Sequence, residues 1–359
     1  MPTIVDLPTL VAALPEPARA RFERLFFVQL DVGELRVPPT MREWVRQRFG
    51  SVEAVERQQV VRVVNRITFE GALYNPLRAQ RPVPMLPVAQ ADTEGERFFA
   101  DPLRTTAEDV FGRVQGQHCV TTSNIARWER WHAVVIFNER DPLRLSREAL
   151  RESFAVSLEW AQHAHALDSQ ARYFVWMWNG GLKGGASIQH AHVQIALGRG
   201  MHYSRIEFLR RVALAYRAQH ASDYFDDLFA AHADLGLGFS LGTVRGFVYL
   251  AAQRPKETWL IGTAFDAALA DALHTTLQRL AQRTGLQAFN VVACLPPLFA
   301  DGSDEDWRGF PCFLRIADRG PAGMIASDIG AIDLYAHSAI NADPFVVYQA
   351  LVGDECALG

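Results

Sequence analysis

A short glycine-rich stretch holds the side chains of this sequence that could do chemistry. It runs from residue 178 to residue 195 as WNGGLKGGASIQHAHVQI. An apolar run before the glycines and an alternating run after them predict a strand, a loop and a second strand. Residues two apart on a strand share a face. His190, His192 and Gln194 are therefore predicted to point one way, while the apolar residues between them face a core.

The loop has the residue types of a phosphate site. Its glycines, Gly185 among them, allow backbone N–H groups to approach an oxyanion closely. Ser187 can donate a hydroxyl, Asn179 an amide and Lys183 a positive charge. A neutral imidazole in such a place can attack phosphorus, and a covalent intermediate divides a difficult transfer into two easier steps.

Two other interpretations of the paired histidines stay open. They could be surface side chains on a glycine-rich hairpin, or metal ligands, because His190 and His192 share one strand face. No Cys, Asp or Glu close in the sequence completes a metal-ligand set. The combination of Asn, Ser, two His and Gln at fixed spacing favours a reactive site over both alternatives.

The spacing resembles that of the histidine-triad superfamily, in its branch of galactose-1-phosphate uridylyltransferases and diadenosine tetraphosphate phosphorylases. That branch has an Asn, a Ser eight residues on, and H-x-H-x-Q beginning three residues after the Ser, as in Asn179, Ser187, His190, His192 and Gln194. The resemblance implies that His192 takes up a nucleoside monophosphate and that the His190 carbonyl holds its ring. It further implies that Gln194 and Ser187 bind phosphate oxygens and that Asn179 positions the loop.

Four further positions carry the resemblance. Residues 75–82, NPLRAQRP, resemble the HRAKRP-like segment whose arginines contact nucleotide phosphates in the uridylyltransferases. Arg78 and Arg81 match those arginines, with a solvated turn as the alternative. Asn124 falls where the superfamily contacts the nucleoside, and a turn-forming Asn is again the alternative. His132, before an apolar strand, resembles a histidine that we interpret as structural.

Bulk properties exclude several classes of partner. The chain of 359 residues is 49% hydrophobic and 21% charged, as in ordinary globular proteins. A net charge of −4 gives no reason to expect nucleic-acid binding. No apolar run reaches membrane-spanning length and the N-terminus lacks the features of a signal peptide, so we expect no membrane partner and a cytoplasmic location. The four cysteines form no C-x-x-C pair, so the metal site of many uridylyltransferases is not carried over, and no required cofactor is expected.

The elements around the loop predict an α+β protein in three regions. Residues 1–58 are expected to be helical, from Pro15 to Leu30 and from Met41 to Gln58. Residues 59–200 form a catalytic half of histidine-triad type. Residues 201–359 form a second such half, giving a pseudo-duplicated arrangement of antiparallel sheets with packed helices.

The second half is inferred from repeated order. The order strand–strand–helix–strand–strand over residues 118–197 occurs again after residue 242. In the second half Phe310, Cys312 and Leu314 take the places of the H-x-H-x-Q residues. We therefore expect one nucleophile per chain.

The resemblance implies a nucleotidyltransferase that works by double displacement. His192 would expel a phosphorylated leaving group from a nucleotide sugar, and a phosphorylated acceptor such as a sugar 1-phosphate would attack the nucleotidyl-histidine. Phosphorolysis or hydrolysis of a dinucleoside polyphosphate shares the motif and is the nearest alternative. A non-catalytic nucleotide-binding protein is the alternative from another class. A homodimer is expected by resemblance alone.

Overall fold

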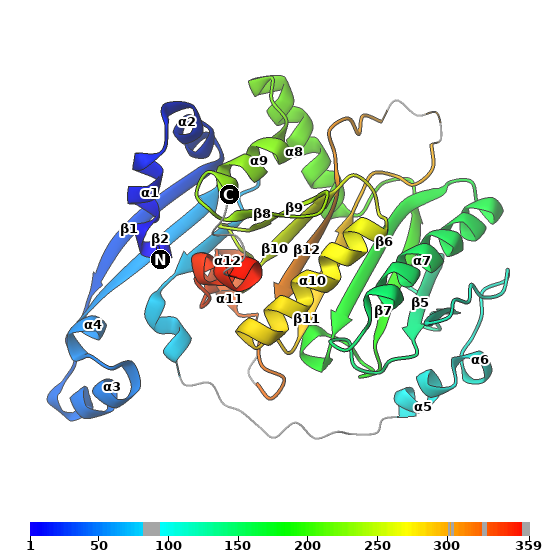
Figure 1. Cartoon of the computed structure of the whole chain (residues 1–359), viewed down its shortest axis with the longest axis horizontal. Coiled ribbons are helices and arrows are strands. Elements are labelled where there is room, and N and C mark those ends of the chain that lie inside the picture. Colours follow the sequence, from blue (N-terminus) through cyan, green and yellow to red (C-terminus); the bar gives the residue numbers. More distant parts are fainter. Residues whose placement is uncertain (82–93, 301, 303–304, 325–328, 354–359) are drawn as a thin grey trace.

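Two β-sheets form the framework of the computed structural model, which describes residues 1–81, 94–300, 302, 305–324 and 329–353 (Figure 1). Within these ranges the smaller sheet has the strand order β1 (Phe26–Glu34), β2 (Arg57–Asn65), β3 (Gly71–Tyr74), β13 (Ser338–Ile340). The larger sheet of the same ranges has the order β4 (Cys119–Ser123), β5 (Trp131–Phe137), β7 (His192–Arg199), β6 (Ala171–Gly180), β11 (Phe289–Cys294), β12 (Cys312–Asp318), β10 (Thr258–Gly262), β9 (Val244–Val248), β8 (Gly238–Leu241). The predicted α+β class is confirmed.

Helices pack around both sheets. In chain order they are α1 (Leu7–Ala13), α2 (Glu16–Leu25), α3 (Arg42–Phe49), α4 (Val52–Glu56), α5 (Glu94–Ala100), α6 (Pro102–Thr105), α7 (Arg147–Leu167), α8 (Ser204–His220), α9 (Tyr224–Ala233), α10 (Ala267–Thr284), α11 (Ala331–Tyr335) and α12 (Pro344–Val352). Short 3-10 turns are η1 (Ile4–Asp6), η2 (Pro39–Met41), η3 (Pro76–Gln80) and η4 (Leu182–Gly184). None of the helices in the described ranges is long and apolar enough to span a membrane.

One face of the larger sheet packs on α7 and α10 (Figure 1). Trp176 of β6 and Val193 of β7 are buried in this core with Trp160 of α7 and Leu277 of α10. Because successive side chains of a strand alternate between faces, His192 and Gln194 of β7 lie on the face away from these helices. The site therefore lies on the face of the sheet opposite the core that α7 and α10 cover.

The two halves repeat one order and meet in the middle of the larger sheet. The series β4–β5–α7–β6–β7 is matched by β9–β10–α10–β11–β12. The halves are joined where β6 pairs with β11 in antiparallel register, Asn179 opposite Asn290. The pseudo-duplicated arrangement expected from the sequence is present in the strand order.

The N-terminal region differs from its prediction. A helix was expected to continue to Leu30, but α2 ends at Leu25 and β1 begins at the next residue. Residues 26–34 pair with β2 along their whole length, from Phe26 opposite Asn65 to Glu34 opposite Arg57. Val28, Leu30 and Val32 alternate with other residues at the period of a strand, although the same segment also has apolar spacing typical of a helix. The pairing of β1 with β2 favours the strand.

Sequence reasoning matched Cys312 and Leu314 with His192 and Gln194, and the structure places this match on the wrong face of β12. Cys312 and Leu314 of β12 lie in the core under α7 and α10, on the same side as Val193 of β7. The face that carries the site residues in β7 therefore carries Phe313 and Arg315 in β12.

Candidate active site at the glycine-rich loop

His192 is the first residue of β7 and is held in one tautomer. Its side chain lies opposite Ile136 of β5 and the residue is 7% exposed. The ring Nδ1 lies 2.7 Å from the His190 carbonyl oxygen, so Nδ1 carries the hydrogen and donates it. Burial lowers the pKa of His192, an effect that the His190 carbonyl partly offsets, so the ring is neutral near pH 7. Nε2 keeps its lone pair and makes no hydrogen bond within the described residues.

The turn before β7 fixes this geometry. The His190 ring is buried, and its Nε2 lies 2.6 Å from the Phe137 carbonyl oxygen at the end of β5. The Ala191 N–H donates to the Arg140 carbonyl at 2.8 Å. These contacts fix the backbone of His190, whose own carbonyl then orients the His192 ring. His190 thus acts on His192 through its backbone.

Gln194 is oriented by a histidine that sequence reasoning assigned to structure alone. The Trp128 N–H donates to His132 Nδ1 at 3.4 Å, which leaves the hydrogen of the ring on Nε2. That N–H donates to Gln194 Oε1 at 3.2 Å. Burial lowers the pKa of His132, so the ring remains a neutral single donor. The amide NH₂ of Gln194 is consequently the end available to an anion.

Asn124 lies beside this pair. Its Nδ2 is 3.3 Å from His132 Nε2, and its Oδ1 accepts the Ala126 N–H at 2.9 Å. The second contact is an Asx turn, which matches the turn-forming interpretation. A contact of Asn124 with a nucleoside stays a prediction.

The second half of the chain holds the glycine-rich loop in place. Asn290 Nδ2 of β11 donates to Asn179 Oδ1 at 2.7 Å and to the Gly184 carbonyl at 2.6 Å. Arg319 in turn donates to Asn290 Oδ1. Sequence reasoning missed Asn290 and Arg319. The available signal was one Asn within the otherwise apolar run of β11.

The glycines allow the loop to pack closely on β11 and to turn sharply. A Cβ on Gly184 would lie 2.6 Å from the Phe289 carbonyl oxygen. Gly181 and Gly185 have φ of 77° and 96°, in the left-handed region that favours glycine. The Gly185 N–H donates to the Leu182 carbonyl at 2.9 Å, so it is occupied within the turn.

The backbone N–H groups that could bind an oxyanion come directly after the glycines in the sequence. In the described part of the chain the N–H groups of residues 187–189 make no hydrogen bond, and Ser187 is exposed. Lys183 lies half-buried in η4. The loop thus offers three consecutive amides and a hydroxyl between η4 and His192.

Arg78 and Arg81 belong to the segment that follows β3 of the smaller sheet. Arg78 lies in η3, directly after the smaller sheet, and Arg81 follows it. Burial and the neighbouring Arg81 lower the pKa of Arg78, while Asp333 of α11 raises it. Figure 1 shows β1 and β2 of the smaller sheet on the opposite side of the molecule from β7, with α12 between them. No hydrogen bond or ion pair joins these arginines to His192 among the described residues, and their contact with a phosphate stays a prediction.

Among the described residues, an aromatic ring packs against the histidine pair. No group of three or more His, Cys, Asp and Glu side chains that could hold a metal exists among the described residues. The ring of Phe99 in α5 packs against His190 and His192, with centroids 6.1 and 5.2 Å apart. An aromatic side chain thus occupies a position beside both imidazoles.

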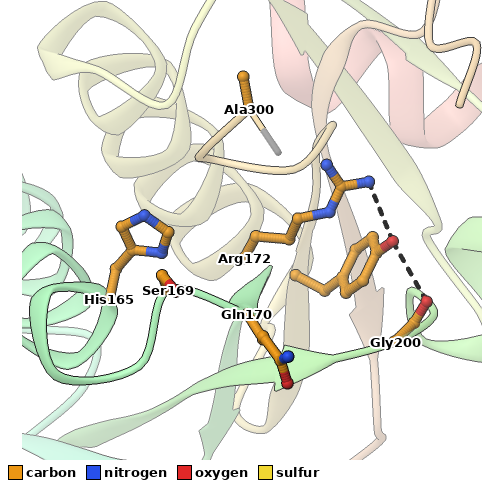
Figure 2. A pocket seen from close by; sticks show the side chains of 7 residues that line it. His165, Ser169, Gln170, Arg172, Gly200 and Ala300 are labelled. Carbon is orange, nitrogen blue, oxygen red and sulfur yellow. Dashed lines mark hydrogen bonds between the residues drawn. The ribbon is translucent and has the colours of Figure 1, made fainter. Parts of the chain in front are cut away.

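A separate pocket lies at the far ends of β6 and β7. It has a volume of about 620 Å³ and is lined by His165, Ser169, Gln170, Arg172, Tyr173, Gly200 and Ala300 (Figure 2). Arg172 donates to the Tyr173 hydroxyl at 3.1 Å and to Glu305 at 2.5 Å, so its charge is already matched. Since Tyr173 lies opposite Gly198, at the other end of β7 from His192, this pocket is distinct from the loop site.

Comparisons with known proteins give the fold. No protein-family model and no curated protein matches the sequence. Among solved structures, ADP-glucose phosphorylase from Arabidopsis thaliana with bound ADP-glucose is 16% identical, with a TM-score of 0.61 over 80% of this chain and 97% of that chain. A GalT-like protein from the same plant is 15% identical, with a TM-score of 0.59 over 79% and 96%. A uridylyltransferase is 18% identical, with a TM-score of 0.56 over 83% and 99%.

These similarities confirm the predicted resemblance at the level of fold. The chain shares the fold of these three proteins. Yeast Ap4A phosphorylase superposes with a TM-score of 0.36 or less, which is too low to argue from.

Proposed function

We propose that this protein is a nucleotidyltransferase in which His192 carries the nucleotidyl group. The observation that carries the proposal is the His192 ring itself. It is buried, neutral, fixed through Nδ1 on the His190 carbonyl at 2.7 Å, and has a free lone pair on Nε2. A fixed neutral imidazole with one available nitrogen is the arrangement that nucleophilic attack by histidine needs.

The reaction has two displacements. In the first, the Nε2 lone pair attacks the α-phosphorus of a nucleotide, a P–N bond forms, and the P–O bond to the phosphorylated leaving group breaks. In the second, an oxygen of the acceptor attacks the same phosphorus and the P–N bond breaks, so that the electron pair returns to the imidazole. The proton stays on Nδ1 throughout and remains hydrogen-bonded to the His190 carbonyl oxygen.

The donors around His192 suit the charge that develops on phosphorus. Within the described residues, no protein group is hydrogen-bonded to the NH₂ of Gln194, the hydroxyl of Ser187 or the amides of residues 187–189. Such donors stabilise a transition state most when they are fixed before the reaction begins. Lys183 adds positive charge to the same loop.

A nucleotide sugar is the donor that the fold similarities support best. ADP-glucose is bound in one of the similar structures, and another is a uridylyltransferase. The acceptor is then a phosphorylated molecule, either a sugar 1-phosphate or inorganic phosphate. A dinucleoside polyphosphate as donor remains the alternative, because the same nucleophile and phosphate donors would serve it.

Intact-protein mass spectrometry tests the proposal. The wild type and His192→Ala would be exposed briefly to ADP-glucose, UDP-glucose or diadenosine tetraphosphate. We expect the mass of one nucleoside monophosphate to be added to the wild type and none to His192→Ala, which retains nucleotide binding. A mutant that still forms the adduct or turns over normally would exclude His192 as the nucleophile. Tight binding with neither adduct nor product would instead indicate a nucleotide-binding protein.

A further inference from the structure

Phe99 is an aromatic side chain in direct contact with the nucleophile. Its ring meets the His192 ring at 5.2 Å between centroids and an angle of 82°, and the His190 ring at 6.1 Å and 80°. Edge-to-face geometry at these distances is a favourable aromatic contact. Sequence reasoning had no sign of it, because Phe99 is more than 90 residues from His192 in the chain.

The helix that carries Phe99 is tied to the sheet that carries His192. Thr105 Oγ1 donates to the Phe98 carbonyl at 2.6 Å, which joins α6 to α5. Arg113 donates to the carbonyls of Thr106 at 2.6 Å and of Thr121 at 3.2 Å. Since Thr121 belongs to β4, these bonds link α5 and α6 to the edge of the larger sheet and set the position of Phe99.

Phe99 has no group that could donate or accept a proton. What it can do is exclude water from the ring of His192, a residue that is 7% exposed as a whole. A nucleotidyl-histidine has two competing fates, since water and a phosphorylated acceptor can attack the same phosphorus. A side chain that limits the access of water decides between them.

We propose that Phe99 is a positioning residue that shields nucleotidyl-His192 from water and so directs the nucleotidyl group to the phosphorylated acceptor. The transfer part of this inference rests on the proposed function, whereas the shielding part does not. The acceptor is guided to phosphorus by Gln194 and the amides of residues 187–189, which bind anions. Water gains no such guidance and is kept from the ring on the side of α5.

The two fates give different products, which makes the inference measurable. When water attacks, its oxygen forms the new P–O bond, the P–Nε2 bond breaks, and the nucleoside monophosphate is released with one proton. When inorganic phosphate attacks, a phosphate oxygen forms that bond and the nucleoside diphosphate is released. The ratio of monophosphate to diphosphate therefore reports the shielding.

The first test measures shielding without any turnover. Wild type, Phe99→Leu, Phe99→Ala and Phe98→Ala would be treated with diethylpyrocarbonate, and carbethoxylation of His192 followed by fragment-ion mass spectrometry. Phe98 is the matched control because it is the neighbouring residue in α5 and is 45% exposed. We expect faster modification of His192 in Phe99→Ala, a smaller increase in Phe99→Leu, and the wild-type rate in Phe98→Ala. Equal rates in all four proteins would overturn the proposal, whether or not the protein is an enzyme.

The second test measures the fate of the intermediate. With ADP-glucose as donor and inorganic phosphate as acceptor, Phe99→Ala should raise the ratio of AMP to ADP roughly tenfold, equivalent to about 1.4 kcal/mol between the two barriers. Phe98→Ala should leave the ratio unchanged. An unchanged ratio in Phe99→Ala, with adduct formation intact, would overturn the proposal. If the wild type forms no adduct with any donor, the proposed function fails instead, and the modification rates alone decide the role of Phe99.

Discussion

The two ends of the Gln194 amide have different partners, and this asymmetry makes the residue useful. Its oxygen accepts from His132 Nε2, while its NH₂ is left for a phosphate oxygen. A glutamine without the His132 contact could turn its amide over and present an oxygen to an anion, which is repulsive. The neutral tautomer of His132, fixed by the Trp128 N–H, is therefore what gives Gln194 a single orientation.

Substitutions at this pair should be strongly non-additive. We expect Gln194→Ala to slow adduct formation by about 10²–10³-fold, the typical effect of removing one preorganised donor. His132→Ala should have a smaller effect, since it loosens Gln194 without removing it. Because His132 acts through Gln194, the double mutant should be no slower than Gln194→Ala alone. The donor would be the nucleotide that forms the adduct in the mass-spectrometry experiment. Rapid-quench measurement would then give the rate of adduct formation for the two single mutants and the double mutant.

A histidine on the surface provides the control for this cycle. His163 of α7 has a side chain that is 51% exposed and belongs to the helix on the opposite face of the sheet. His163→Ala should react at the wild-type rate. Losses that multiply in the double mutant would show that His132 has a role of its own, independent of Gln194.

At the scale of elements, the parts that bear the site were predictable because their local patterns are strong. The strands on either side of the glycine-rich loop were located from apolar periodicity to within a few residues. The motif residues His192 and Gln194 lie, as predicted, together on the face of the strand that points away from the core under α7 and α10. Local pattern and tertiary fold agree there, which is where sequence reasoning works best.

The misassigned elements have a physical cause in common, namely a partner distant in sequence. β1 was expected to be helical because its strand pattern is weak until β2 pairs with it. Leu314 of β12 was matched with Gln194 although it faces the core. Only packing against α7 and α10 decides that Leu314, and not Arg315, is buried in that core. Asn290, which holds Asn179, could not be found because no local signal joins residues 111 apart.

The loop itself gives a test at this scale. A Cβ on Gly184 would lie 2.6 Å from the Phe289 carbonyl oxygen of β11, so Gly184→Ala must displace either the loop or the strand. We expect it to lower the free energy of unfolding by about 1–3 kcal/mol, as overpacking usually does, and to slow adduct formation. Urea unfolding followed by tryptophan fluorescence gives the stability.

Gly33→Ala is the matched substitution. The nearest atom to a Cβ there is the Gln58 carbonyl oxygen at 3.8 Å, an ordinary contact, and Gly33 lies far from the loop in β1. It should leave stability and reactivity nearly unchanged. If the two alanine variants unfold at the same urea concentration, the close packing of Gly184 on β11 is not what fixes the loop.

At the scale of the whole molecule, the largely buried Arg315 joins the two sheets. Arg315 of β12 donates through Nη1 to Glu70, beside the smaller sheet, at 2.9 Å, and through Nε to Glu257 at 2.9 Å. Tyr249 donates to the other oxygen of Glu70 at 2.9 Å. Burial alone would lower the pKa of Arg315, but Glu257 and Glu70 raise it well above its usual value, so the arginine is charged. Two buried carboxylates thus share the Arg315 cation, and the exposed Arg205 lies 4.0 Å from Glu70 as well.

Removal of that cation should cost much more than the loss of a surface ion pair. Arg315→Met leaves Glu257 without its counter-charge and Glu70 with only the exposed Arg205, 4.0 Å away. Loss of one partner of a buried ion pair typically destabilises a protein by about 3–5 kcal/mol. Arg245→Met, which breaks the exposed pair of Arg245 with Asp226, should cost less than about 1 kcal/mol. Adding Glu70→Gln and Glu257→Gln to Arg315→Met should restore part of the loss, because it removes the unpaired charges. Urea unfolding of the four proteins would measure these differences, and equal stability of Arg315→Met and Arg245→Met would mean that the charged cluster does not hold the sheets together.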